Sequence, residues 1–127
     1  MLKIFISNPF KYPINERLIV GNLTNFLRNK VQDDCEVSIR ITGYSEMLNL
    51  ARKYLFEPNN LHNVLSFAYS EVRDFLPDPD GINRLGDIVV CYEKAKDEAK
   101  AANKSLDEWL YYLIEHGAKH LLGIHHD

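Results

Sequence analysis

Several features that would place a protein in a special class are missing from this sequence of 127 residues. No apolar run approaches the roughly 18 residues that a membrane-spanning helix needs. The apolar stretch before Pro9 is too short for a signal peptide, so we expect a cytoplasmic protein that does not enter a membrane. There is no internal repeat and no low-complexity segment, and the length favours one domain over residues 1–127.

Cysteine and positive charge are also scarce. Cys35 and Cys91 stand far apart and neither belongs to a CxxC pair, which predicts two reduced, buried or half-buried thiols. The net charge is −3, from 15 Lys and Arg against 18 Asp and Glu. This balance argues against nucleic-acid binding, because phosphate contacts depend on Lys and Arg. It leaves room for a local basic patch, and Arg52 and Lys53 form one such pair.

The residues that are present have the composition of an ordinary globular protein, 46 % hydrophobic and 26 % charged. Hydrophobic residues alternate between the periods of strand and helix. Strands are expected over 2–7, 36–42, 63–69 and 86–92, and helices over 13–30, 45–54, 93–102 and 105–121. Pro13, Ser45 and Ser105 are the expected helix starts, and residues 77–81 the strongest turn. The pattern predicts an α+β fold, with a mixed sheet of about four strands packed with helices.

The histidines cluster near the end of the sequence. His116 and His120 are four residues apart on the last predicted helix, so their rings lie on one face and can share a metal ion. Gly123 permits a chain reversal that can bring His126, or His125, to the same ion. Three nitrogens leave one zinc position open, as in catalytic sites, where zinc lowers the pKa of bound water to about 7. A solvated or structural histidine cluster is the alternative.

Three ordered blocks of the sequence match one family pattern. Residues 116–126 read HGAKHLLGIHH and are similar to HGxxHLxGxDH; residues 63–67 read NVLSF, and residues 85–90 read LGDIVV, similar to LGDIVI. The pair Leu48-Asn49 is similar to an LN pair that precedes a basic residue in the same family. Together these blocks, which cover the chain from about residue 37 to 126, resemble the YbeY family of endoribonucleases.

The resemblance implies a zinc-dependent, single-strand-specific endoribonuclease, a hydrolase of ribosomal RNA processing and ribosome quality control. Its partners would be single-stranded RNA, ribosomal RNA or a ribosomal subunit. It implies His116, His120 and His126 as the ligands of one Zn²⁺ ion, on the last helix and the turn after it. The family arginine that contacts RNA falls at Lys53, beside Arg52, so one of these two is expected to steady charge on the phosphodiester.

Some positions depart from the family pattern or have two interpretations. His125 replaces an aspartate and is either an alternative ligand or a spare imidazole. His62 replaces a threonine and is expected to be a solvated loop residue. Asp87 either orients a ligand histidine or is a turn carboxylate. Ser66 is a candidate to line the cleft. The aromatic residues before His116, which are Trp109, Tyr111 and Tyr112, are expected to pack rather than to stack on bases.

No general base is evident in the sequence. The zinc peptidase motif HExxH has a glutamate after its first histidine, whereas Gly117 occupies that position here. Glu115 lies on the other side of His116, about 100° around the helix. The missing glutamate argues against a peptidase. Two alternatives to the nuclease stay open: a zinc hydrolase of another class, such as a peptidase or amidase, and a non-enzymatic ribosome-associated protein with structural zinc.

Overall fold

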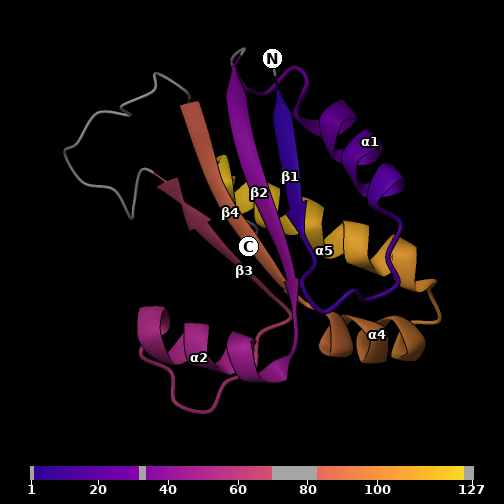
Figure 1. Ribbon diagram of the computed structural model, residues 1–127, viewed down its shortest axis with the longest axis vertical. Helices are drawn as coiled ribbons and strands as arrows, with labels where there is room; N and C mark the ends of the chain where they lie inside the picture. The colour runs from indigo at the N-terminus through magenta and orange to yellow at the C-terminus, as the bar shows by residue number, and fades with distance from the viewer. Residues whose placement is uncertain (1, 32–33, 70–82, 125–127) are drawn as a thin grey trace.

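A four-stranded mixed sheet forms the centre of the fold (Figure 1). The computed structural model describes residues 2–31, 34–69 and 83–124. The strands are β1 (Lys3–Ser7), β2 (Cys35–Thr42), β3 (Val64–Ala68) and β4 (Asn83–Cys91), in the spatial order β1-β2-β4-β3. β1, β2 and β4 are parallel, and β3 pairs antiparallel with β4. The predicted α+β fold with a four-stranded mixed sheet is confirmed.

The described helices cover the two faces of the sheet unequally. They are α1 (Glu16–Leu27), α2 (Tyr44–Leu55), α4 (Tyr92–Ala101) and α5 (Leu106–Leu121). α1 and α5 pack on one face, and Figure 1 shows α5 crossing behind the strands. α2 lies near one end of the sheet and packs on the opposite face. None of the helices in the described ranges combines the length and apolar character that a membrane crossing requires.

Strand alternation divides the apolar residues into two cores. Ile39 and Ile88 point toward α5 and pack with its residue Ile114, and all three are almost fully buried. Met47 of α2 packs in a smaller cluster on the other face with Val89. Complete burial of one such side chain stabilises the fold by about 1.5–3 kcal/mol, so the larger core fixes α5 against β3 and β4. Cys35 and Cys91 are buried free thiols, as predicted.

Two of the three predicted helix starts are wrong by a few residues. α1 begins at Glu16 rather than at Pro13, because the side chain of Asn15 accepts a hydrogen bond from the Leu18 N–H at 3.1 Å. α2 begins at Tyr44 after Gly43 rather than at Ser45, and Glu93 accepts from the Tyr44 N–H at 3.2 Å. The third start is confirmed: Ser105 and Glu108 form the predicted capping box of α5.

Gly86 is required where β4 passes between β3 and α5. Its φ is +151°, and a Cβ there would lie 2.4 Å from the Phe67 carbonyl oxygen and 2.7 Å from a methyl carbon of Leu121. We expect Gly86→Ala to lower the free energy of unfolding by about 2 kcal/mol or more, because the cost of the strained backbone and the cost of the overpacked side chain sum. Urea denaturation measures the change. Gly21→Ala is the matched control, because nothing lies within 4 Å of a Cβ at that helical position.

Candidate metal centre

The last two turns of α5 bring His116 and His120 together as the sequence predicts. Their Nε2 atoms are 3.1 Å apart and their rings meet edge to face, with centroids 4.7 Å apart. Two nitrogens bound to one tetrahedral zinc ion at about 2.0–2.1 Å each would be about 3.3 Å apart. The observed separation is close to that value, so this pair of side chains fits a shared zinc ion.

The chain turns sharply directly after the histidine pair. Gly123 has a φ of +79°, its N–H donates to the His120 carbonyl at 3.0 Å, and the Ile124 N–H donates to the Lys119 carbonyl at 2.9 Å. These bonds form the motif in which a left-handed residue ends a helix, so the predicted left-handed helix end at Gly123 is confirmed. His125 and His126 lie outside the described residues. Within the described ranges, no third His, Cys, Asp or Glu completes a metal-binding group.

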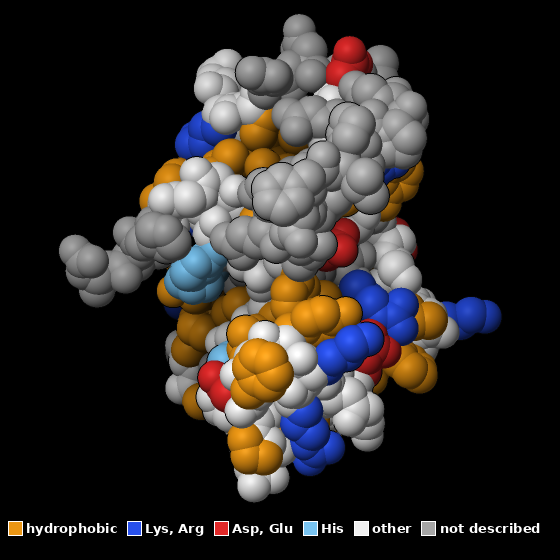
Figure 2. Space-filling model, turned by 90° about the vertical axis from the view of Figure 1, so that its left-hand side faces the viewer, with side chains coloured by type: hydrophobic (Ala, Val, Ile, Leu, Met, Phe, Trp, Pro, Cys, Tyr) orange, Lys and Arg blue, Asp and Glu red, His pale blue; other side chains and the backbone are white. Residues whose placement is uncertain are grey.

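His116 and His120 line a cavity of about 330 Å³ between α5 and the edge strand β3. The other side of this cavity is formed by the chain that enters β3, including His62, and by Ser66 within the strand. Figure 2, which faces the β3 side of the molecule, shows histidine side chains at the surface on the left. The hypothesis that Ser66 lines the cleft is therefore confirmed, and His62 joins the candidate site.

His62 is held by a carboxylate rather than being a solvated loop residue. Its Nε2 lies 2.6 Å from Oε2 of Glu57, and its side chain is 27 % exposed. Asn60 donates to the same Glu57 oxygen at 3.0 Å. The hydrogen bonds from His62 and then from Asn60 lower the pKa of Glu57, so this carboxylate is ionised at neutral pH. An ionised carboxylate favours the tautomer with the proton on Nε2, which leaves the lone pair on Nδ1 of His62.

Helix α4 fixes the segment that carries His62. Asn63 donates to Glu98 Oε1 at 3.0 Å, and Lys94 Nζ donates to the carbonyl of Leu61 at 2.9 Å. The Asn63 carbonyl in turn accepts from the N–H of Cys91 at 2.9 Å. These bonds hold the chain on both sides of His62, so its position beside the histidine pair is set by tertiary contacts. Only the neighbouring NVLSF block in the sequence pointed to this segment.

Gly117 has no space for a side chain, which explains the departure from the peptidase motif. A Cβ at Gly117 would lie 2.8 Å from Cγ2 of Ile88 and 3.4 Å from Cγ2 of Val64. Gly117 itself lines the cavity, but a side chain there would point at Ile88 and Val64 of the sheet. A glutamate there would enter the core instead of reaching a metal-bound substrate.

We expect Gly117→Ala to lower the free energy of unfolding by up to about 2 kcal/mol. The clash with Ile88 costs about 1–3 kcal/mol, partly offset by the roughly 1 kcal/mol better helix propensity of alanine. Thermal unfolding followed by circular dichroism measures the loss. In a second protein in which Ile88→Ala removes the clashing Cγ2, Gly117→Ala should cost less, and an equal cost in both backgrounds would contradict this explanation.

Arg52 and Lys53 lie in the last turn of α2, which packs on the sheet face opposite α5. Arg52 Nε donates to the carbonyl of Pro58 at 2.8 Å, and Lys53 Nζ lies 5.2 Å above the ring of Tyr54. Neither is among the described residues that line the cavity of His116 and His120. Figure 2 shows several Lys and Arg side chains lower on the face that carries the histidines. Their role toward RNA stays a prediction.

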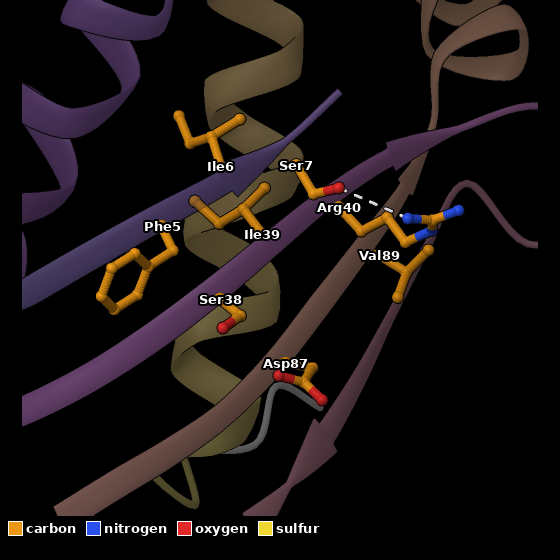
Figure 3. Close-up of a pocket in the computed structure, with 8 residues that line it drawn as sticks. All are labelled: Phe5, Ile6, Ser7, Ser38, Ile39, Arg40, Asp87 and Val89. Atoms are coloured by element: carbon orange, nitrogen blue, oxygen red, sulfur yellow. Dashed lines mark hydrogen bonds between the residues drawn. The ribbon is translucent and has the colours of Figure 1, made fainter. Parts of the chain in front are cut away.

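Asp87 faces away from the histidine pair. Gly86 and Ile88 point toward α5, so strand alternation places Asp87 on the other face, beside Ser38 and Val89 in a hollow of about 320 Å³ (Figure 3). Partial burial raises the pKa of Asp87. Asp87 is therefore not placed to accept from His116 or His120, and the part of the hypothesis that concerns His126 falls outside the described residues.

The side chains around His116 on the outer face of α5 have separate partners. Glu115 accepts from the hydroxyl of Tyr111 at 3.0 Å and lies 3.6 Å from Nζ of Lys119. Burial, and then the bond to Glu115, raise the pKa of Tyr111. These contacts agree with the prediction that Glu115 is poorly placed as a base. Tyr111 packs as expected, whereas Tyr112 is 55 % exposed.

Comparison with known proteins agrees with these features. The family model described as Endoribonuclease YbeY matches residues 11–127. A protein named Endoribonuclease YbeY from Colwellia psychrerythraea is 33 % identical over 120 residues, which are 93 % of this chain and 74 % of that protein. One of the same name from Syntrophomonas wolfei is 35 % identical over 126 residues, 95 % of this chain and 80 % of that protein. The solution structure of TM1509 from Thermotoga maritima matches 100 % of this chain, and the match covers 75 % of the TM1509 chain. The TM-score is 0.60 and the sequence identity is 19 %, so the two proteins share the fold. The chain belongs to the YbeY family.

Proposed function

We propose that this protein is a zinc-dependent endoribonuclease that cleaves single-stranded RNA in the cytoplasm, in ribosomal RNA processing and ribosome quality control. The main support is the pair of opposed Nε2 atoms of His116 and His120, 3.1 Å apart in a cavity. The relatives named Endoribonuclease YbeY support RNA as the substrate. The exposed Arg52 and Lys53 supply local positive charge for an RNA backbone on a chain whose net charge is −3.

His116 and His120 would hold the zinc ion, with His126 as the third ligand that the family resemblance implies. Imidazole ligands favour zinc over the hard cations Mg²⁺ and Ca²⁺. A bound zinc ion would supply Lewis acidity toward a phosphodiester and toward water.

His62 supplies the general base that the sequence motif lacks. It shares the cavity with His116 and His120, and Glu57 holds its Nε2. With the proton on Nε2, Nδ1 of His62 can accept a proton from the attacking water. Glu57 then stabilises the imidazolium that forms, as a carboxylate does when it orients a catalytic histidine. Arg52 or Lys53 steadies the negative charge that develops on the phosphodiester.

Cleavage of a labelled single-stranded RNA by the purified protein tests this function. Cleavage should stop when a chelator removes the metal and should return when zinc is added back. A perfectly paired duplex of the same sequence is the matched control and should stay intact. Labelled casein separates the nuclease from a peptidase. An intact single strand in the presence of zinc would count against the nuclease and in favour of a non-enzymatic zinc protein.

A further inference from the structure

A second hollow lies on the outer side of α5, next to the candidate metal centre. Its volume is about 330 Å³, and its lining includes Tyr112, Glu115, His116 and Lys119. His116 also lines the cavity that contains His120, so this one side chain separates the two spaces. A polymer bound with its reacting bond at the histidine pair would therefore place a neighbouring unit in the outer hollow.

Tyr112 is the exposed aromatic surface of this hollow. Its side chain is 55 % exposed although it lies one helical turn before His116. The ring of Trp109 supports it at a centroid distance of 5.0 Å and an interplanar angle of 32°. Trp109 is itself fixed, because its Nε1–H donates to Glu98 Oε1 at 3.1 Å. The Tyr112 ring is thus held by its neighbours and still offers area to a flat ligand.

The polar groups of the hollow suit the edge of such a ligand. Lys119 offers N–H donors and Glu115 offers carboxylate acceptors, with Nζ and Oε2 3.6 Å apart. Because these charges are opposite and adjacent, the hollow has little net charge to attract a phosphate. A nucleobase has the matching chemistry, with an apolar flat face and an edge of donors and acceptors, and aromatic side chains are the usual stacking partners of unpaired bases.

We propose that this hollow is a nucleobase subsite in which Tyr112 stacks on the base of a nucleotide adjacent to the cleaved phosphodiester. The identity of the ligand rests on the proposed ribonuclease function. The subsite favours single strands, because the base must leave its own stack to reach Tyr112. Stacking on an aromatic ring selects weakly among bases, so the subsite adds affinity and strand preference rather than a strict sequence requirement.

The subsite is tested by measuring the binding of an oligonucleotide that the protein cannot cleave. The probe is a short, fluorescein-labelled, single-stranded 2′-O-methyl oligonucleotide, followed by anisotropy in the presence of a chelator. Tyr112→Ala should weaken binding by about 5- to 100-fold, the range that loss of one stacked base produces. Tyr112→Phe keeps the stacking surface and should bind like the wild type. Phe10→Ala is the matched control, since Phe10 is an equally exposed aromatic (61 %) outside this hollow.

The fluorescence of Trp109 locates the binding event, because it is the one tryptophan of the chain and contacts Tyr112. Emission from Trp109 should change as the oligonucleotide binds. Equal affinity of Tyr112→Ala and the wild type, or no binding by the wild type, would overturn the subsite. If zinc restores cleavage by the wild type but Tyr112→Ala and the wild type bind the oligonucleotide equally well, only the subsite is wrong. If binding depends on Tyr112 but zinc restores no cleavage, the nuclease is wrong and the subsite stands.

Discussion

Replacing His120 by alanine is expected to abolish cleavage of single-stranded RNA and to leave the fold intact. His120 Nε2 lies 3.1 Å from Nε2 of His116, so the change removes half of the described nitrogen pair. Loss of Lewis-acid stabilisation worth several kcal/mol corresponds to a fall in kcat/KM of about a thousand-fold or more. The side chain of His120 is exposed and alanine favours helix, so the stability should change little. Rate, zinc content and circular dichroism are measured on the same sample.

The same experiment separates a catalytic from a structural zinc ion. The core around α5 is filled by apolar residues such as Ile114 and Ala118, which are fully buried, so apolar packing is expected to hold α5 in the variant. If zinc were structural, His120→Ala would unfold the protein as well as inactivate it. His126→Ala should repeat the loss of zinc and activity, whereas His125→Ala should retain both. The reverse result for these two variants would make His125 the third ligand.

The second large effect is expected at His62. Because a positioned general base contributes about 10²- to 10⁴-fold, His62→Ala should lower kcat by that factor. Its zinc content should equal that of the wild type, since the described residues form no metal-binding group of three that includes His62. Single-turnover cleavage under saturating RNA measures the chemical step directly.

Glu57→Gln tests the orienting role in the same assay. Glutamine can still accept from His62 Nε2, but it lacks the charge that stabilises the imidazolium, so its rate should lie between those of the wild type and His62→Ala. Asn59→Ala is the matched control, because Asn59 is an exposed residue of the same loop outside the cavity lining. A wild-type rate in His62→Ala would remove His62 from the mechanism, and loss of zinc would make it a ligand.

Local signals predicted much of the fold because local physics decides those features. The capping box at Ser105 and the left-handed Gly123 fix both ends of α5, and four-residue spacing alone places His116 beside His120. The start of α2 was missed because the N–H of its first residue, Tyr44, donates to Glu93, a residue far along the chain. A local sequence pattern cannot predict a helix cap whose acceptor belongs to another helix.

The errors in the candidate site have a similar origin. Strand alternation places the side chains of Asp87 and Ile88 on different faces of the sheet. The tertiary packing, which no local pattern predicts, decides that α5 covers the face of Ile88. His62 was expected in solvent because no sequence pattern shows that this loop folds back to bring Glu57 against it or that α5 adjoins it. Tyr112 was expected to pack because helical spacing does not reveal which stripe of α5 faces outward.

Because the chain is synthesised from its N-terminus, the candidate site can form only late in synthesis. Its cavity needs the segment around His62 and the end of α5, the last helix described, and β4 must first pair with the distant β2. A partly translated chain can already pair β1 with β2 beside α1, but it has no histidine pair while α5 is still inside the ribosome. Under the proposed function, the nascent chain therefore gains its active site only after α5 has left the ribosome.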